Sequence, residues 1–106
     1  MYDMGYLRFF ADRKEVVVGI STIIYCLMSG SFAEIHMNSG KVYKTKMKFT
    51  DIENSLGERF IKIHRGCVVS AMAIHEITDK INLNNGETLI YTKRKKKEII
   101  NRLHEI

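Results

Sequence analysis

Proline is absent from this 106-residue sequence, so each tight turn has to be built from Gly, Asn, Asp or Ser. Long apolar runs are absent too. The longest, residues 23–28, is far shorter than the roughly 20 residues that a membrane-spanning helix needs. The first residues carry neither the basic lead nor the apolar region of a signal peptide. We therefore expect no membrane span and a cytoplasmic location.

The chain also lacks a flexible linker, an internal repeat and any shift in composition along its length. Its hydrophobic content of 45% and charged content of 27% are ordinary for a folded globular protein. A length of 106 residues is typical of one domain. These features predict a single domain over residues 1–106 that can bury its own core.

Residues suited to metal binding or catalysis are few. The two cysteines, Cys26 and Cys67, lie in apolar surroundings without a CxxC spacing, so we expect buried free thiols, with a redox switch as the weaker alternative. The four histidines show no spacing typical of a helical metal site. No base stands at a meaningful spacing from a nucleophile, and no phosphate-binding glycine loop is present. We expect no enzyme activity, metal, cofactor or small-molecule substrate.

Short apolar runs broken by turn residues fill most of the chain and predict β-strands. In residues 32–37 apolar and polar side chains alternate, which is the period of a half-buried strand. Residues 67–74 fit a helix or a strand equally well. The expected strands, joined by turns that include residues 12–14, 38–40 and 84–86, are residues 6–10, 15–20, 23–28, 32–37, 41–47, 77–83 and 88–92.

Two segments carry helical signals. Thr50 and Glu53 match a capping box, in which both side chains bond the first free amides of a helix. Gly57 can supply the stop, which predicts one short helix between them. Residues 93–106 predict a C-terminal helix whose apolar stripe consists of Ile99, Ile100, Leu103 and Ile106.

Positive charge is concentrated at the start of that last helix. Of the 17 Lys and Arg residues, five are adjacent, which leaves 12 basic against 12 acidic side chains elsewhere; the five are Lys93, Arg94, Lys95, Lys96 and Lys97. Cations in the first turn of a helix oppose its dipole, so folding alone does not favour them there. These cations, together with the free amides of the first helical turn, could bind a phosphate. We interpret the run as phosphate-binding, with a solvated charged face as the alternative.

Two further polar features interrupt apolar sequence. The pair His64-Arg65 can brace a local turn, but the five-donor head of Arg65 also suits a phosphate or a guanine edge. The tripeptide Ser29-Gly30-Ser31 consists of small residues that let a backbone approach a ligand closely. A plain connecting loop explains the tripeptide equally well, so both features are candidates only.

The segment Phe60-Ile61-Lys62-Ile63-His64-Arg65-Gly66-Cys67-Val68-Val69-Ser70 resembles the hallmark F-x-x-x-H-R-S-x-x-V-N of the LytTR DNA-binding domain. Other parts of the family pattern follow in order, and the resemblance covers roughly residues 5–104. They are Ile23-Ile24-Tyr25 for I-x-Y-I, Gly40 with Tyr43 for the first d-G hairpin, Ile74-His75-Glu76-Ile77 for I-x-x-I, and residues 83–92 for the second d-G hairpin. The departures are Gly66 and Ser70, where the family favours Ser and Asn, and Thr92-Lys93-Arg94, where it favours Ser-Arg.

This resemblance implies a mostly β fold of packed antiparallel sheets and hairpins, with one short internal helix and a C-terminal helix. It implies sequence-specific binding of double-stranded DNA at paired repeats, with a homodimer on the DNA as a related expectation. Such domains regulate transcription alone or as outputs of bacterial response regulators, and their loops enter successive grooves. By position, the loop Ser29-Gly30-Ser31, the pair His64-Arg65 and the pair Lys93-Arg94 would face DNA. The expected set of DNA-binding residues also includes Lys62, Thr92, Lys95 and Lys97. Among them, Arg94 would read a base in the major groove, because lysine lacks its bidentate fork.

A basic interaction module that docks an acidic protein or a membrane surface is the alternative function. Its membrane form is disfavoured, because Ile99, Ile100 and Leu103 predict a stripe that faces the core. A preference for particular duplex sequences would separate DNA reading from docking to any polyanion.

Overall fold

The structure, a computed structural model, describes residues 5–106. Short 3-10 turns at Ile20–Thr22, Ala71–Ala73 and Lys93–Lys95 connect its main elements. In chain order, these elements are β1 (Tyr6–Ala11), β2 (Lys14–Gly19), β3 (Ile23–Ser29), β4 (Phe32–Met37), β5 (Val42–Thr45), α1 (Phe49–Leu56), β6 (Phe60–His64), β7 (Cys67–Ser70), β8 (Ile74–Ile77), β9 (Ile81–Leu83), β10 (Thr88–Leu89) and α2 (Lys96–Glu105).

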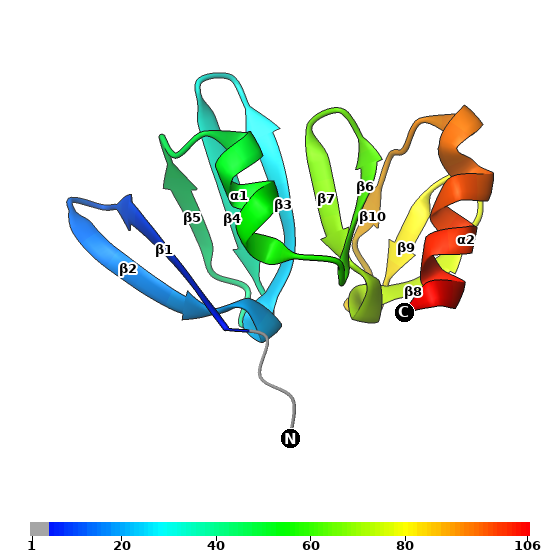
Figure 1. Cartoon of the computed structure of the whole chain (residues 1–106), viewed down its shortest axis with the longest axis horizontal. Helices are drawn as coiled ribbons and strands as arrows, with labels where there is room; N and C mark the ends of the chain where they lie inside the picture. Colours follow the sequence, from blue (N-terminus) through cyan, green and yellow to red (C-terminus); the bar gives the residue numbers. More distant parts are fainter. Residues whose placement is uncertain (1–4) are drawn as a thin grey trace.

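The strands form three antiparallel sheets. The central sheet has five strands in the order β5-β4-β3-β7-β6. The β1–β2 hairpin lies on its β5 side, and the β10-β9-β8 sheet with α2 lies on its β6 side (Figure 1). The predicted fold class, mostly β with one short internal helix and a C-terminal helix, is confirmed.

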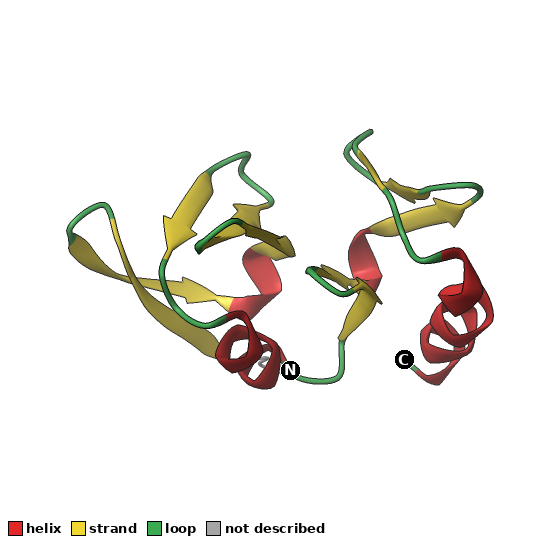
Figure 2. Ribbon diagram, turned by 90° about the horizontal axis from the view of Figure 1, so that it is seen from above, coloured by secondary structure: helices red, strands yellow, loops and turns green. Residues whose placement is uncertain are grey.

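Two hydrophobic cores lie on the two faces of the central sheet. Successive side chains of a strand point to opposite faces, and in β3 Cys26 joins one core while Tyr25 joins the other. Helix α1 contributes Ile52 to the first core, and α2 contributes Ile99 to the second. Seen from above, α1 lies beside the β1–β5 part of the chain and α2 beside the β6–β10 part (Figure 2). The sheet is therefore covered on both sides.

The β1–β2 hairpin closes with a two-residue turn. Asp12 has a φ of 53° and Arg13 a φ of 63°, which is the geometry that matches the right-handed twist of paired strands. Lys14 already belongs to β2, so the turn is one residue shorter than the expected 12–14. In the hairpins after β4 and β9, the turns use Gly40 and Gly86 at positive φ, as predicted.

The capping box predicted for α1 is wrong. The helix begins at Phe49, and the Ile52 amide bonds the carbonyl of Lys48, so Lys48 is the N-cap and Thr50 lies inside the helix. Lys48 makes no side-chain cap bond. The Phe49 side chain is only 5% exposed, and its burial stabilises the early start by more than a cap of about 1 kcal/mol would. Gly57, at a φ of 81°, ends the helix as expected.

Two strand predictions also need correction. The expected strand 77–83 is broken, because Thr78 bonds Lys80 through its amide and closes a turn between β8 and β9. The expected strand 88–92 pairs only over Thr88–Leu89. The unassigned segment 67–74 consists of β7, a 3-10 turn and the first residue of β8.

The last helix starts later than predicted, because residues 93–95 form a 3-10 turn ahead of α2. Ile99 is buried, and Ile100 and Leu103 are partly buried. Ile106 lies outside the helix and is 44% exposed, so it does not extend the stripe. Over residues 5–106, neither helix is long and apolar enough to cross a membrane.

Replacing Phe49 tests the revised start of α1. Phe49→Ala should lower the free energy of unfolding by about 3–5 kcal/mol, because a buried ring is lost. Thr50→Ala should change it by less than about 0.5 kcal/mol, since Thr50 is exposed and caps nothing. Urea unfolding measures both. A loss of about 1 kcal/mol or more for Thr50→Ala would restore the capping box.

Candidate nucleic-acid interface

Three turns that carry most of the predicted contact residues lie along one edge of the molecule, the upper edge in Figure 1. They are the β3–β4 turn, the β6–β7 turn and the segment that leads into α2. Six of the predicted contact residues there are exposed: Ser29, Gly30, Ser31, Arg65, Lys93 and Arg94. The fold thus brings together residues that are more than 60 positions apart in the sequence.

Backbone hydrogen bonds hold these turns beside one another. The Met28 amide donates to the Gly66 carbonyl oxygen at 2.7 Å, which joins the first turn to the second. The Thr92 amide donates to the Ile63 carbonyl oxygen at 2.9 Å, which joins the second to the third. The spacing of the three turns is therefore set by the main chain and not by flexible side chains.

Gly66 allows the first two turns to approach closely. A Cβ atom at this position would lie 3.2 Å from the Cβ atom of Met28, which is tighter than ordinary contact. The hallmark quoted above has Ser here, so that side chain would push against Met28. The departure at Gly66 therefore has a steric reason within this chain.

His64 braces the β6–β7 turn. Its Nδ1 accepts a hydrogen bond from the Gly66 amide at 3.1 Å. Burial lowers the pKa of His64 below its usual value, so the ring is neutral at pH 7 and carries its proton on Nε2. His64 Nδ1 therefore braces the local turn, which is one of the two roles considered from the sequence. The Nε2–H group has no partner in the described chain and can donate outward.

The two neighbouring cations before α2 behave differently. The Lys93 ammonium donates to the Asp79 carbonyl oxygen and lies 4.6 Å from the centre of the Tyr91 ring. Arg94 is exposed, and its guanidinium has no partner among the described residues. Lys93 is therefore tethered to the β8–β9 turn, whereas Arg94 is available to a ligand.

The other predicted contact residues also include both engaged and available cations. Lys62 on β6 pairs with Glu53 of α1 at 3.4 Å, so its charge is already engaged. Lys97 is exposed and Lys95 is partly buried. Arg65 is exposed, with no ion pair in the part of the chain that the structure describes. Of the predicted residues, Arg65 and Arg94 thus offer the two unpaired guanidinium groups along this edge.

Comparison with known proteins gives this edge its context. The family model of the LytTr DNA-binding domain matches residues 13–104. The chain belongs to this family. Among solved structures, it is similar to the LytTr DNA-binding domain of a Bacillus cereus protein described as a methyl-accepting/DNA response regulator. The TM-score is 0.79 at 16% sequence identity, covering 93% of this chain and 96% of that chain, which shows a shared fold. A search of the curated proteins finds no match.

The LytTR family is one of DNA-binding domains and not of enzymes. The resemblance inferred from the hallmark at residues 60–70 is therefore confirmed, and DNA is the partner that the family implies. The edge with the three turns is the candidate DNA-binding surface of this LytTR domain.

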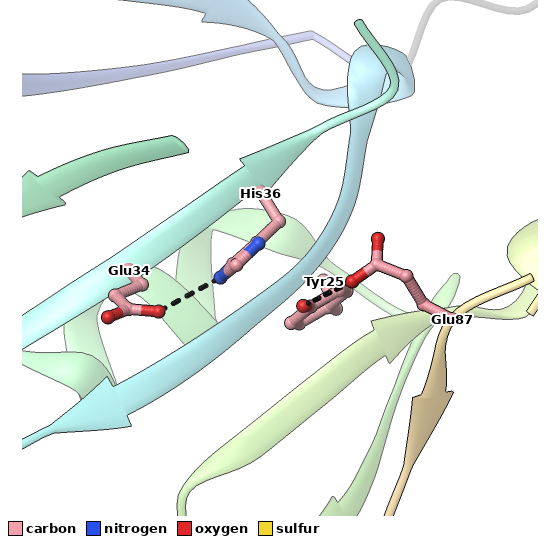
Figure 3. Close-up of polar contacts among 4 residues, drawn as sticks. All are labelled: Tyr25, Glu34, His36 and Glu87. Carbon is pink, nitrogen blue, oxygen red and sulfur yellow. Dashed lines mark hydrogen bonds and ion pairs between the residues drawn. The ribbon is translucent and has the colours of Figure 1, made fainter. Parts of the chain in front are cut away.

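A polar network that the sequence did not reveal connects the central sheet to the β9–β10 turn (Figure 3). The Tyr25 hydroxyl on β3 donates to Glu87 Oε2 at 2.9 Å. The Tyr25 ring stacks on His36 of β4, with 4.1 Å between ring centres. His36 Nε2 in turn contacts Glu34 Oε1 at 3.0 Å. The network therefore joins β3, β4 and the turn before β10.

This network ties the β9–β10 turn to strands β3 and β4. Strands β3 and β4 carry the turn at residues 29–31, and the β9–β10 turn precedes β10, which is followed by the segment at residues 92–95. Burial, with added effect from the Glu87 bond, raises the pKa of Tyr25 well above its usual value, so the hydroxyl stays protonated and continues to donate. The only sequence signal was a hydroxyl in the apolar strand 23–28, 62 positions from its partner.

The two cysteines are buried free thiols, as predicted. Cys26 and Cys67 are in the two different cores, so they lie on opposite faces of the central sheet and cannot bond each other in this fold. Burial raises the pKa of both thiols to about 12. Because the thiolate is the reactive form, this environment disfavours the redox alternative.

Removing one hydroxyl tests the network. Tyr25→Phe should lower the free energy of unfolding by about 1–2 kcal/mol, because the hydrogen bond from the Tyr25 hydroxyl to the Glu87 carboxylate is lost. Tyr43→Phe is the matched control, since the Tyr43 hydroxyl has no hydrogen bond among the described residues. Thermal and urea unfolding of the two variants give the comparison. Equal stability of the two variants would show that the Tyr25–Glu87 bond does not hold the β9–β10 turn.

Proposed function

We propose that this LytTR domain reads a specific double-stranded DNA sequence to regulate transcription, as a response-regulator output domain or a stand-alone regulator. The observation that carries the proposal is the shared edge of three turns, linked by the bonds from Met28 to Gly66 and from Thr92 to Ile63. Rigid turns with exposed polar groups can enter grooves and keep a fixed register along a duplex. We further propose that residues 5–104 act as one domain in this role.

Arg94 is the proposed base reader. Its planar head can bond guanine O6 and N7 together in the major groove, and it is exposed without a partner in the described chain. Lys93 is held by the Asp79 carbonyl oxygen, so it is better suited to a phosphate that approaches the same turn. The hydrogen bond that holds Lys93 supports the choice of Arg94, and not Lys93, as the base reader.

The other two turns supply mixed contacts. Gly30, at a φ of 62°, has no heavy atom within 4 Å of where a Cβ would lie, so the backbone between Ser29 and Ser31 is open to a ligand. The Nε2–H of His64 and the guanidinium of Arg65 are donors suited to phosphate or base edges. Phosphate contacts are proposed for the cations and hydroxyl that remain: Thr92, Lys95 and Lys97, with Lys62 contributing only if it leaves Glu53.

The dimensions of the molecule support contact with successive grooves. Its longest axis is 39 Å, close to one helical turn of B-DNA at about 34–36 Å. One domain can therefore span about one turn. Two domains on paired repeats, as a homodimer on the DNA, would extend the footprint and gain affinity from two linked binding events.

Substitution of Arg94 tests base reading. On duplexes selected from a random pool, Arg94→Ala should reduce discrimination between the selected site and a single-base variant by about 1–3 kcal/mol. Lys96→Ala removes an exposed cation of the same run, and it should weaken binding to all duplexes equally. Mobility shifts with competitor at several salt concentrations measure both effects.

Each outcome separates the possible roles. If Arg94→Ala and Lys96→Ala affect every duplex alike, Arg94 does not read a base. If the wild-type domain prefers no sequence and any polyanion displaces it equally, the docking module replaces DNA reading as the function. A loss of salt slope of about 0.9 in either variant would assign that side chain to a phosphate contact.

A further inference from the structure

A groove lies between β1 and the end of β5, beyond the three turns. Its volume is about 540 Å³. It is lined by residues from the β1–β2 hairpin, by the first residue of β4 and by the segment that ends β5: Arg8, Phe9, Phe10, Ala11, Asp12, Arg13, Phe32, Lys44, Thr45, Lys46 and Met47. The prediction of DNA-binding residues from sequence included none of them.

The residues that line this groove include more cations than anions. They include two arginines and two lysines, Arg8, Arg13, Lys44 and Lys46, against the single acidic residue Asp12. None of these four cations forms an ion pair in the part of the chain that the structure describes. Like charges gathered without ion-pair partners disfavour folding slightly, whereas an anion bound beside them would be attracted by this excess of positive charge.

The groove is continuous with the candidate interface. Strand pairing places Ala33 opposite Thr45, so the end of β5 lies beside the β3–β4 turn. Phe32 directly follows that turn and is 40% exposed, and the Lys46 ammonium lies 5.7 Å from the centre of its ring. In Figure 1 the end of β5 and the β1–β2 turn continue the row of turns away from α2. A ligand that lies along the three turns would reach the groove next.

We propose that this groove holds the sugar-phosphate backbone of the duplex just beyond the segment contacted by the β3–β4 turn. The proposal rests on the proposed function and adds a fourth contact region, which binds flanking DNA without reading its sequence. Arg13 and Lys46 act from its two walls. Arg13 is placed by the tight turn, where its φ of 63° fixes the direction of the chain, and Lys46 is placed beside Phe32.

Substitution of Asp12 should strengthen DNA binding, whereas substitution of a groove cation should weaken it. Asp12 lines the groove together with the four cations, and its negative charge would repel a phosphate there. Asp12→Asn removes this charge and keeps a residue type that tolerates positive φ. The variant should therefore bind long duplexes more tightly than the wild type, and short duplexes equally.

The experiment varies duplex length. The selected site is extended outward in steps of two base pairs, first at one end and then at the other, and anisotropy gives the affinity at several salt concentrations. For the wild type, extension at one end only should raise both the affinity and the salt slope, by about 0.9 for each added phosphate contact, and then reach a plateau. The variant Arg13→Asn with Lys46→Ala should bind the short duplex normally and gain nothing from extension.

A matched control removes the same charge elsewhere. Lys41 lies at the other end of β5, with its ammonium 5.1 Å from the centre of the Tyr43 ring, and Lys14 is exposed outside the groove. The double variant Lys14→Ala with Lys41→Ala should keep the full gain from extension. Thermal unfolding of all variants checks that each one folds.

Two results would overturn the groove proposal. One is a wild-type domain whose affinity does not depend on flanking length, and the other is a groove variant that keeps the wild-type gain. A wild-type domain that fails to bind the short selected duplex would contradict the proposed function itself. The failures of the two proposals are therefore distinguishable in one set of measurements.

Discussion

Burial of the central β-sheet on both faces requires two separate cores, one for each set of alternating side chains. Strand β3 shows this division at neighbouring positions, where Cys26 enters one core and Tyr25 the other. The β1–β2 hairpin and α1 cover the first face, while the β8–β10 sheet and α2 cover the second. Because every covering element is packed on the same sheet, the turns between strands keep fixed positions relative to one another.

The candidate interface follows from that arrangement. Three of the turns meet at one edge, where the amides of Met28 and Thr92 bond them together. At the opposite edge, the Tyr25–Glu87 bond holds the β9–β10 turn against the sheet. Only some of the cations at the interface are available to a ligand. Lys93 is hydrogen-bonded to a carbonyl group, whereas Arg94 is exposed without a partner in the described chain. Rigid spacing with a few available cations is the combination that sequence-specific DNA binding needs.

Local signals in the sequence predicted much of the fold, and non-local contacts limited the rest. Alternation in residues 32–37 and the Asn85-Gly86 turn depend on neighbouring residues, so they were readable directly. The capping box failed because burial of Phe49 is a tertiary effect that outweighs a local cap. The Tyr25–Glu87 bond and the groove between β1 and β5 join segments far apart in the chain. The family resemblance located the candidate turns, but not which of their cations are already engaged.

Amide chemical shifts of the domain, recorded as a selected duplex is added, test the central claim that the three joined turns form the DNA-binding surface. The account predicts that the largest changes fall at residues 29–32, 64–66 and 92–95. Amides near the ends of α1 and α2, at residues 57–59 and 102–106, lie at the opposite edge and should hardly change. Changes concentrated at that opposite edge, with the three turns unaffected, would contradict the account.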